Sequence, residues 1–379
     1  MKRRQFIQLV GGGVVVAATG VGCSSNGSSR KASPDLPWHQ AGSQYPDPAR
    51  RALSYAVLAP NPHNRQPWLV RLESDTQFTL FCQLDRRLPE TDPMDRQILI
   101  GLGCFTELMR QAALADGYQA DIRWFPKGEP GQRLDQKPIA KVQLTPTQAS
   151  KDPLFNQVLA RRSNKEPFDM KQPVSQTLLS QLQSVSTSVA TTNDVDWVNR
   201  IKAITWRGHE IEMYTPHTYL ESVDLMRIGD KAVAENPDGI DLGGPMMGLL
   251  KTFGMASREK LIDTQSTMFT QGMKIYEDIH HNTPAFVWIV SEDNSRLAQV
   301  QAGMDYIRLN LKATEMGLAL HPVSQTLQEY PEMAEEYQHI HQELLVQSPQ
   351  RIQMLARIGF NKAPKPSPRW PLETRILPN

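Results

Sequence analysis

Apolar residues follow two kinds of spacing along the first part of the chain. Alternation of apolar and polar residues over 68–72 and 78–84, on either side of a turn at 74–75, predicts a β-hairpin. Apolar residues three and four apart predict a long helix over 96–116, which begins after acidic residues at 92–95 and ends at Gly117. The other elements expected here are a helix at 49–58 and strands at 119–125 and 141–144.

The second part of the chain repeats this mixture of helices and strands. A helix is expected at 175–185, and long helical stretches follow it. A continuous apolar run at 285–290 predicts a buried strand, and 296–316 predicts a second long helix that ends at Gly317. The chain leaves this helix through 318–325, and a last strand is expected at 352–358. Together the two parts predict an α+β protein.

The first residues have the composition of an export signal. Arg3 and Arg4 precede a short apolar run at 9–21, and the Arg3-Arg4-x-Phe-Ile pattern is similar to a twin-arginine signal. The run is shorter than the roughly 20 residues that a membrane span needs, which disfavours the alternative of an anchor. We assign 1–23 to this signal, with Cys23 as a candidate site of lipid attachment. Residues 24–45 are rich in Ser, Gly and Pro, and predict a flexible tether.

Composition and motifs exclude several classes of protein. With 379 residues, 40% hydrophobic content and a net charge of +1, the chain has no basic excess that would favour nucleic acid. Three cysteines form no Cys-x-x-Cys pair, and Met213 replaces the second histidine of a zinc-protease helix, so no metal site is expected. The chain also lacks a Gly-x-Ser-x-Gly elbow and a dinucleotide-binding glycine motif after a strand.

A basic cluster interrupts the apolar pattern in mid-chain. The string Arg161-Arg-Ser-Asn-Lys165 follows an apolar helical turn at 155–159, and Pro167 ends this predicted helix because proline lacks an amide donor. Arginine offers a planar fork to phosphate oxygens, lysine a point charge and serine a hydrogen bond. The cluster therefore suits a phosphate, with a solvated basic turn as the alternative.

A second motif connects the first helix to the hairpin. Its sequence is Pro60-Asn-Pro-His-Asn-Arg-Gln-Pro-Trp68. Read without any resemblance, it is a proline-rich turn that leads into a strand and places Trp68 in the core.

The two motifs resemble those of the nitroreductase superfamily of FMN flavoproteins. The basic cluster matches the family's Arg-x-Ser-x-Lys run, which holds the flavin phosphate and ribityl chain. The proline-rich loop is similar to the family's Pro-Ser-x-x-Asn-x-Gln-Pro-Trp loop, which contacts the flavin ring and ribityl chain, although it departs from that pattern at Asn61 and Pro62. The tail at 359–371 is similar to the family's closing Gly-x-x…Pro-x-x-Arg-x-Pro, and Ser367 stands where a second cation is often found.

The resemblance implies a set of cofactor-binding residues and no catalytic side chain. Lys165 is expected to lie near the flavin ring as the cation that tunes it, Arg369 to return to the phosphate, and the turn after the second long helix to lie over the ring. The residues implied to bind FMN are Asn61, Pro62, Asn64, Gln66, Arg161, Ser163, Lys165, Ser324, Gln325 and Arg369.

Each part of the chain holds the motif that the other part lacks. Ordinary members of the family are homodimers in which each flavin takes the basic motif from one subunit and the proline-rich loop from the other. Here the loop lies in 46–150, and the basic motif and tail lie in 151–379. The resemblance therefore implies the nitroreductase fold as a fused pseudo-dimer with one flavin per chain and no partner subunit, similar to the Acg-like branch.

A glycine-rich apolar segment at 236–256 is a candidate lid over the flavin, with a surface loop as the alternative. The residues that suit the underside of such a lid are Met246, Met247, Leu249 and Leu250.

The resemblance implies an exported FMN oxidoreductase that passes two electrons through the flavin to an aromatic or quinone-like acceptor. Family members take hydride from a nicotinamide, which is scarce outside the cytoplasm, so the donor stays open. A twin-arginine signal suits this function because that route exports folded, cofactor-loaded protein to the periplasm. The alternatives are a non-catalytic protein that sequesters flavin under the lid, and a structural lipoprotein that has lost the flavin.

Overall fold

The computed structural model describes residues 33–42, 44–252, 254 and 256–378. The predicted export signal and Cys23 lie outside the described residues.

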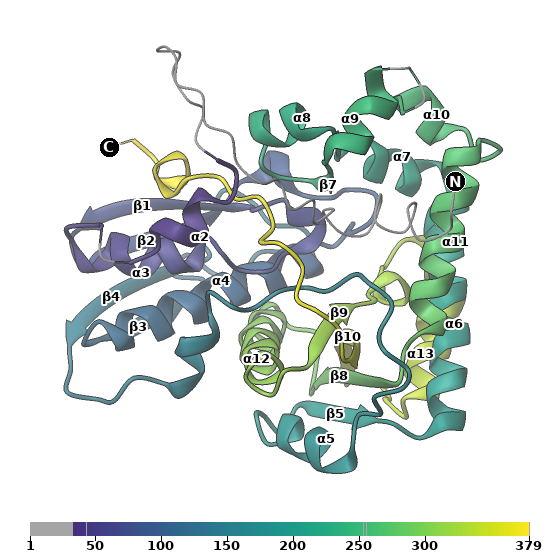
Figure 1. The fold of residues 1–379 in the computed structure, drawn as a ribbon. Helices are drawn as coiled ribbons and strands as arrows, with labels where there is room; N and C mark the ends of the chain where they lie inside the picture. The colour runs from purple at the N-terminus through teal and green to yellow at the C-terminus, as the bar shows by residue number, and fades with distance from the viewer. Residues whose placement is uncertain (1–32, 43, 253, 255, 379) are drawn as a thin grey trace.

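Four antiparallel strands in the order β1-β2-β4-β3 form the sheet of the first half (Figure 1). Apolar side chains of this sheet and of two helices share one buried cluster, because each element presents one apolar face to the others. The predicted hairpin and long helix are confirmed to within a few residues. The elements are α3 (Pro48–Ala56), β1 (Trp68–Ser74), β2 (Gln77–Cys82), α4 (Arg96–Ala115), β3 (Tyr118–Trp124) and β4 (Ala140–Pro146).

The second half contains another four-stranded antiparallel sheet, in the order β5-β8-β10-β9. Its central strand β10 is buried along almost its whole length, as expected for a strand covered on both faces. The elements are α5 (Gln176–Gln183), β5 (Val189–Thr192), β8 (Ala285–Ser291), α12 (Arg296–Glu315), β9 (Ala319–Pro322) and β10 (Arg351–Gly359).

The two halves have the same topology. In each half a helix precedes the first strand, a long helix follows the second strand, and the last strand of the half lies between the second and third strands of its sheet. The second half differs by an insertion between β5 and β8, which forms the top and right side of Figure 1, and by α13 (Ala334–Glu343) between β9 and β10. The inserted elements are α6 (Val195–Tyr214), α7 (Pro216–Asp224), β6 (Met226–Ile228), α8 (Asp230–Glu235), β7 (Ile240–Leu242), α9 (Pro245–Thr252), α10 (Arg258–Ile262) and α11 (Thr267–His281).

The long helices α4 and α12 cross in the middle of the molecule at a pair of glycines. Gly103 and Gly303 occupy the same position in two helices of 20 residues each. A Cβ atom on Gly103 would collide with the carbonyl oxygen of Val300, and one on Gly303 would collide with that of Ile100. The contacts are reciprocal, as at the interface of a two-fold symmetric dimer. The expected arrangement of two fused halves is therefore present within one chain.

Two buried arginines at the starts of these helices repeat the reciprocity. Arg96 of α4 donates to backbone oxygens of Gln353 and Leu327 in the second half, at 2.8 and 2.6 Å. Arg296 of α12 donates to backbone oxygens of the first half, including that of Met94 at 2.8 Å. Each half thus satisfies buried carbonyl groups of the other.

Two predicted segments differ from the structure. The tether expected over 24–45 is ordered in its described part, where Leu36–Gln40 form α2 and Trp38 is buried, because this indole supplies the apolar surface that the polar segment otherwise lacks. The helix expected before the basic motif is a single 3-10 turn, η3 (Pro153–Gln157).

Candidate functional site

The proline-rich loop between α3 and β1 is held in a strained conformation. His63, Asn64 and Gln66 all have positive φ angles, of 45°, 51° and 51°. Such angles cost about 1–3 kcal/mol each for residues other than glycine and persist where the surroundings enforce them, often at functional sites. The Asn61 side chain enforces the turn, because its Oδ1 accepts from the Gln66 amide at 2.6 Å and its Nδ2 donates to the Ala59 carbonyl at 3.1 Å.

The loop lies against α4 at a glycine. A Cβ atom on Gly101 would come within 3.0 Å of the Asn61 Cβ atom and 3.4 Å of the Pro62 ring, so a larger residue would push the loop away. Trp68 follows the loop, is fully buried and stacks on Phe105 of α4 at 5.0 Å. Asn61 and Pro62 therefore shape the loop rather than project from it.

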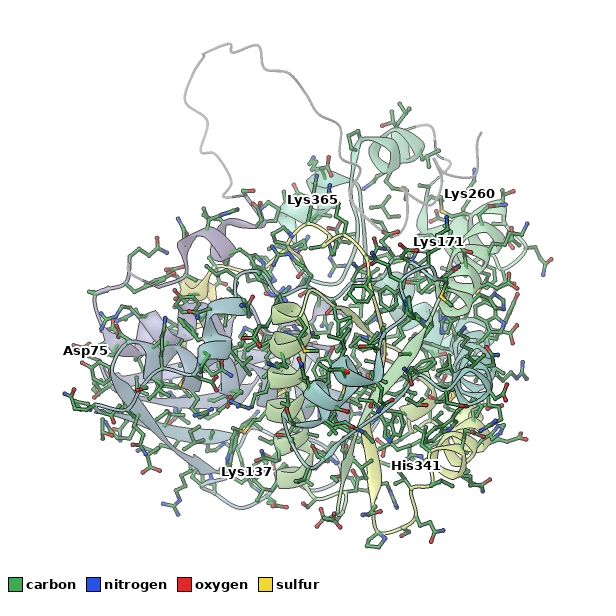
Figure 2. The ribbon with its side chains drawn as sticks, turned by 60° about the horizontal axis from the view of Figure 1, so that its bottom comes forward. Asp75, Lys137, Lys171, Lys260, His341 and Lys365 are labelled. Atoms are coloured by element: carbon green, nitrogen blue, oxygen red, sulfur yellow. The ribbon has the colours of Figure 1, made fainter. Side chains whose placement is uncertain are left out.

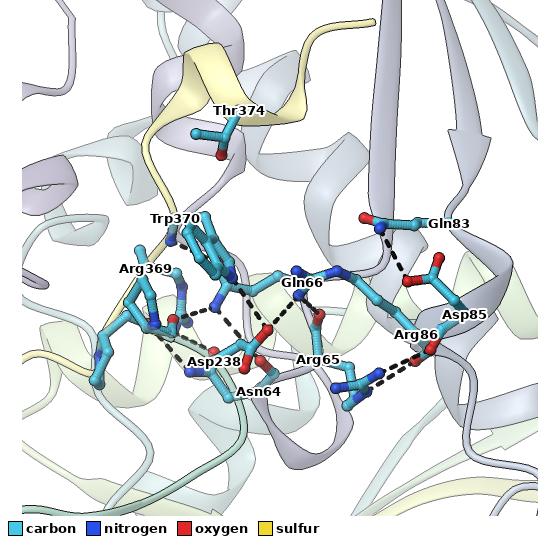
Figure 3. Close-up of polar contacts among 12 residues, drawn as sticks. Asn64, Arg65, Gln66, Gln83, Asp85, Arg86, Asp238, Arg369, Trp370 and Thr374 are labelled. Atoms are coloured by element: carbon cyan, nitrogen blue, oxygen red, sulfur yellow. Dashed lines mark hydrogen bonds and ion pairs between the residues drawn. The ribbon is translucent and has the colours of Figure 1, made fainter. Parts of the chain in front are cut away.

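The C-terminal tail brings Arg369 to this loop. Its Nη1 donates to Asn64 Oδ1 at 2.6 Å and to the Ser367 hydroxyl at 2.7 Å (Figure 3). Its Nη2 donates to the carbonyl oxygens of Leu58 and Ala59 at 3.2 and 3.0 Å. Asn64 in turn donates to the Pro368 carbonyl at 3.1 Å, so the loop of one half and the tail of the other interlock.

Arg161 of the basic motif reaches the same place from the second half. It is 2% exposed, and its Nη2 donates to the Leu58 carbonyl oxygen, which Arg369 also contacts. Arg162 joins them, because the guanidinium groups of all three arginines lie within 4.7 to 5.7 Å of the Trp38 ring. We refer to Arg161, Arg162 and Arg369 as the arginine cluster.

The described part of the chain supplies no anion to the arginine cluster. Within the described ranges no carboxylate forms an ion pair with any of the three side chains. Burial and the charges of the other two arginines hold the pKa of Arg369 well below its ordinary value, and burial with the Arg162 charge lowers the pKa of Arg161 to about 10. Nε and Nη1 of Arg161 and Nε of Arg369 are buried donors without a partner. Because buried donors are normally satisfied, these three point to an anionic group such as phosphate.

Lys165 lies further along the same strand-like segment, beside β9. The Asn164 amide donates to the Leu320 carbonyl at 2.9 Å, which fixes the segment there. The Lys165 side chain is exposed. Burial lowers the pKa of His63 of the loop and of His321 of β9, and the Lys165 charge lowers both further. Lys165 thus stands between the loop of the first half and the sheet of the second. Ser163 is half-buried between Lys165 and the arginine cluster.

The turn that holds Ser324 and Gln325 follows β9 and lies beside α6 of the insertion. Ser324 begins the 3-10 turn η4 (Gln325–Leu327), and Gln325 interacts with Glu212 of α6. Among the described residues, no hydrogen bond joins Ser324 or Gln325 to the loop or to the arginine cluster. The insertion, which has no counterpart in the first half, supplies the partner of Gln325 instead.

The candidate lid does contact the loop. The Gln66 side chain is fully buried and donates to the Pro237 carbonyl at 2.7 Å, while its Oε1 accepts from the Trp370 amide at 2.9 Å. Asp238 then binds Arg86 at 2.6 Å, Arg227 at 2.7 Å and the Trp370 indole at 3.1 Å (Figure 3).

The apolar part of the lid segment packs elsewhere. Met247 and Leu250 belong to a small cluster with β6 and β7, and Leu249 is 50% exposed. These side chains stabilise the insertion itself, so the part of the candidate lid that contacts the loop is 237–239, and not Met247 or Leu250. The side chain of Met246 lies outside the described part of the structure.

The sequence did not reveal two contributors to the site. Trp38 was assigned to the tether, and Arg162 was counted in the motif but not among the cofactor-binding residues. A signal for Trp38 exists, because Asp35-Leu-Pro-Trp38 has proline in a first helical turn and one large aromatic residue in a polar stretch.

The chain is similar to curated proteins of Mycobacterium tuberculosis. It is 26% identical over 284 residues to one that carries the provisional name NAD(P)H nitroreductase, covering 74% of this chain and 76% of the relative. It is 30% identical over 125 residues to the protein provisionally named NAD(P)H nitroreductase acg, covering 32% of this chain and 36% of that relative. These names support the nitroreductase superfamily.

Solved structures of similar proteins include two nitroreductases. The FMN and NADPH-dependent nitroreductase NfnB of Sphigopyxis sp. strain HMH is 16% identical, with a TM-score of 0.36 over 59% of this chain and 97% of its own. The FMN-dependent NfnB of Mycobacterium smegmatis, solved with NADPH, is 13% identical, with a TM-score of 0.35 over 58% of this chain and 96% of its own. No family model matches the chain.

Proposed function

We propose that this protein is an FMN-binding oxidoreductase of the nitroreductase type, with a single composite flavin site. The observation that carries the proposal is the arginine cluster, whose three buried donors have no partner and no balancing anion among the described residues. A phosphate carries two negative charges near neutral pH and accepts several hydrogen bonds, so it would satisfy these donors. The names of the curated relatives support the same assignment.

Residues from both halves of the chain would contact the cofactor. Arg161, Arg162 and Arg369 would hold the phosphate, and Asn64 and Gln66 of the strained loop would face the ribityl chain and the ring. Lys165 would lie near the ring, where a cation stabilises the negative charge of the reduced form. FMN, when bound, supplies the two-electron redox chemistry, and the protein binds and orients it. The acceptor class is an aromatic or quinone-like molecule, the donor stays open, and export by the twin-arginine route to the periplasm is part of the proposal.

The absorption spectrum of the purified protein tests cofactor binding directly. Flavin bands are expected, and the cofactor released by heat should be FMN and not FAD. Reduction by excess NADPH under argon, compared with reduction by dithionite, then asks whether a nicotinamide is the donor. A colourless protein that takes up no added FMN would refute the proposal.

The contacts of Gln66 favour a second candidate function, a protein that holds flavin without turning it over. Both polar atoms of the Gln66 amide are engaged, one by Pro237 of the lid and the other by Trp370 of the tail. Asp238 fastens the lid through three partners, including a buried ion pair with Arg86. A lid held in this way would cover the loop and keep substrates from a bound ring.

An Asp238→Asn variant separates the two candidates. It removes the charge that fastens the lid to Arg86 and Arg227 and keeps the side-chain shape. If the lid holds back turnover, the variant should be reduced faster than the wild type by the same donor, and flavin should dissociate faster. Equal rates in both proteins would leave the oxidoreductase as the better assignment. Asp230→Asn is a matched control in the insertion, because among the described residues its carboxylate contacts the Gly244 amide and no arginine.

A further inference from the structure

The segment that precedes the first half is built into the arginine cluster. The Trp38 indole is 4% exposed and lies 5.7, 4.7 and 5.7 Å from the guanidinium carbons of Arg161, Arg162 and Arg369. Attraction between a cation and an aromatic face acts within about 6 Å and strengthens when water is excluded. One indole therefore contacts every cation of the cluster.

Directed hydrogen bonds fix this segment at both ends. Trp38 Nε1 donates to the Ser367 carbonyl at 2.9 Å, and the Arg369 amide donates to the Pro34 carbonyl at 2.8 Å. Beyond α2, the Gly42 amide donates to the buried Ser54 hydroxyl of α3 at 2.8 Å. In Figure 1, α2 accordingly lies beside the C-terminal tail. The indole is thus held in one orientation against the arginines.

The arginine cluster is unfavourable as part of a protein core, but it is suitable for binding an anion. Buried cations without a counter-ion repel one another and lose their hydration, so such a group is not retained for packing alone. The unpartnered donors of Arg161 and Arg369 are buried, and their guanidinium groups lie against the Trp38 ring. An anion bound there would be enclosed on the Trp38 side and could carry only one organic substituent.

We propose that Trp38 is a cofactor-binding residue that closes the arginine cluster into a site for one terminal phosphate monoester. It thereby selects FMN over riboflavin, which lacks the phosphate, and over FAD, whose phosphate carries a second substituent. The selection of FMN rests on the proposed function. The binding of a phosphate group rests on the arginine cluster alone.

Flavin binding by the full chain, stripped of cofactor, tests the selection. We expect Trp38→Ala to weaken FMN binding by about tenfold or more, the equivalent of about 1.4 kcal/mol, and to leave riboflavin binding nearly unchanged. The preference for FMN over FAD should shrink in the same variant. Trp38→Phe, which keeps an aromatic face and loses the bond to Ser367, should fall between. An unchanged ratio of FMN to riboflavin affinity in Trp38→Ala would overturn the inference.

Trp197→Ala is the matched control. Trp197 is half-buried on α6, and its Nε1 also donates to a backbone carbonyl, that of Glu343 at 3.2 Å. Losing this indole removes the same kind of bond away from the arginine cluster. It should change stability without changing the ratio of FMN to riboflavin affinity, and an equal change of ratio in both variants would assign the Trp38 effect to general destabilisation.

A second experiment, the phosphate arm of the test, uses inorganic phosphate and does not depend on flavin. At equal ionic strength, replacing chloride by phosphate should raise the melting temperature of the flavin-free wild type more than that of Trp38→Ala. Equal shifts would overturn the role of Trp38 in anion binding. If the wild type binds no flavin of any kind, the proposed function fails, and the phosphate arm still decides whether Trp38 closes an anion site.

Discussion

Two side chains of the arginine cluster are buried with unsatisfied donors, which destabilises the folded protein. Arg161 gives up its hydration for a single bond to the Leu58 carbonyl, with two donors unsatisfied. Arg369 also has an unsatisfied donor, although it makes several good bonds. Binding sites commonly hold such destabilised groups, and their replacement stabilises the free protein while it removes function.

Arg161→Met separates binding from stability at this cluster. Methionine fills a similar volume without a charge, so the melting temperature of the flavin-free protein should stay the same or rise. FMN affinity should fall by about tenfold or more, because hydrogen bonds to charged groups contribute roughly 1.5–3 kcal/mol. Thermal melting and flavin titration of one preparation check both outcomes.

Lys171→Ala is the control for Arg161→Met, since Lys171 is an exposed cation in the same segment (Figure 2). It should leave FMN affinity unchanged. Equal losses in the two variants would mean that general electrostatic attraction, and not a phosphate contact, explains the effect.

Arg369→Ala tests the return of the tail to the phosphate. This variant should also weaken FMN by about tenfold or more, but it should destabilise the free protein, because Arg369 ties the tail to Asn64, Leu58 and Ala59. Flavin titration and thermal melting measure the two effects. Unchanged FMN affinity would place the phosphate away from the tail.

A buried carboxyl on α6 should make stability depend on pH. Burial, together with the Glu221 charge, raises the pKa of Glu212 to about 7, although Gln328, Ser222 and Gln325 bond to it. Because this pKa is raised in the folded state, the stabilisation is fully present below pH 4.5 and is lost as pH rises through 7. Glu212→Gln should therefore gain stability over the wild type between pH 5 and 8, by at most roughly 3 kcal/mol. Urea unfolding at pH 5 and at pH 8 measures the difference in stability between the variant and the wild type. The same difference at both pH values would contradict the raised pKa of Glu212.

At the scale of elements, the crossing of α4 and α12 depends on glycine. Because the helices meet backbone to backbone at Gly103 and Gly303, the other side chains of both helices can interlock around the crossing. The Cys104 thiol donates to the Gly303 carbonyl at 3.1 Å at the same place. The contact that joins the two halves is therefore set by the absence of two side chains.

Gly303→Ala should separate these helices and destabilise the protein by about 1–3 kcal/mol or more. Gly272→Ala is a helical control on α11, where an added Cβ meets no atom within 4 Å. It should be neutral or stabilise by about 0.5–1 kcal/mol, because alanine favours a helix more than glycine does. Chemical unfolding of both variants measures the contrast, and similar stabilities would show that the crossing can relax.

At the scale of the whole molecule, one chain supplies both sides of the site. The loop of the first half meets the tail and basic motif of the second, and the tail then continues to the first sheet, where Ile376 pairs with Val70. The two sheets, α4 and α12 contribute to a single buried cluster. Neither half can bury its apolar surface or complete the site alone.

The intact protein should therefore bind close to one flavin per chain without a second subunit. Light scattering combined with flavin absorbance gives the mass and the stoichiometry together. Residues 46–150 expressed alone should be poorly soluble, and residues 151–379 alone should bind no FMN, because they lack Asn64 and Gln66. A flavin held between the loop of one chain and Arg161 of another would contradict this architecture.

The sequence alone determined much of the secondary structure and the two principal motifs. The long helices were predictable because their apolar residues recur at helical spacing, and the hairpin because its strands alternate around a turn. Arg161 lies in a basic string whose residue types already favour a phosphate. Asn64, Gln66 and Arg369 were implied by the resemblance of their strings to the nitroreductase motifs. The division into complementary halves followed from where those strings lie.

Only the tertiary structure decided which of these residues meet and what surrounds them. The turn at Ser324 and Gln325 lies beside the insertion, where Gln325 bonds to Glu212, a contact that no local pattern specifies. Trp38 joined the arginines although hundreds of residues separate it from Arg369, because its segment gains bonds to the tail and contacts to the three cations only in the folded chain. Local spacing sets the type of an element, but burial, charge and hydrogen-bond satisfaction across the chain decide which elements make a site.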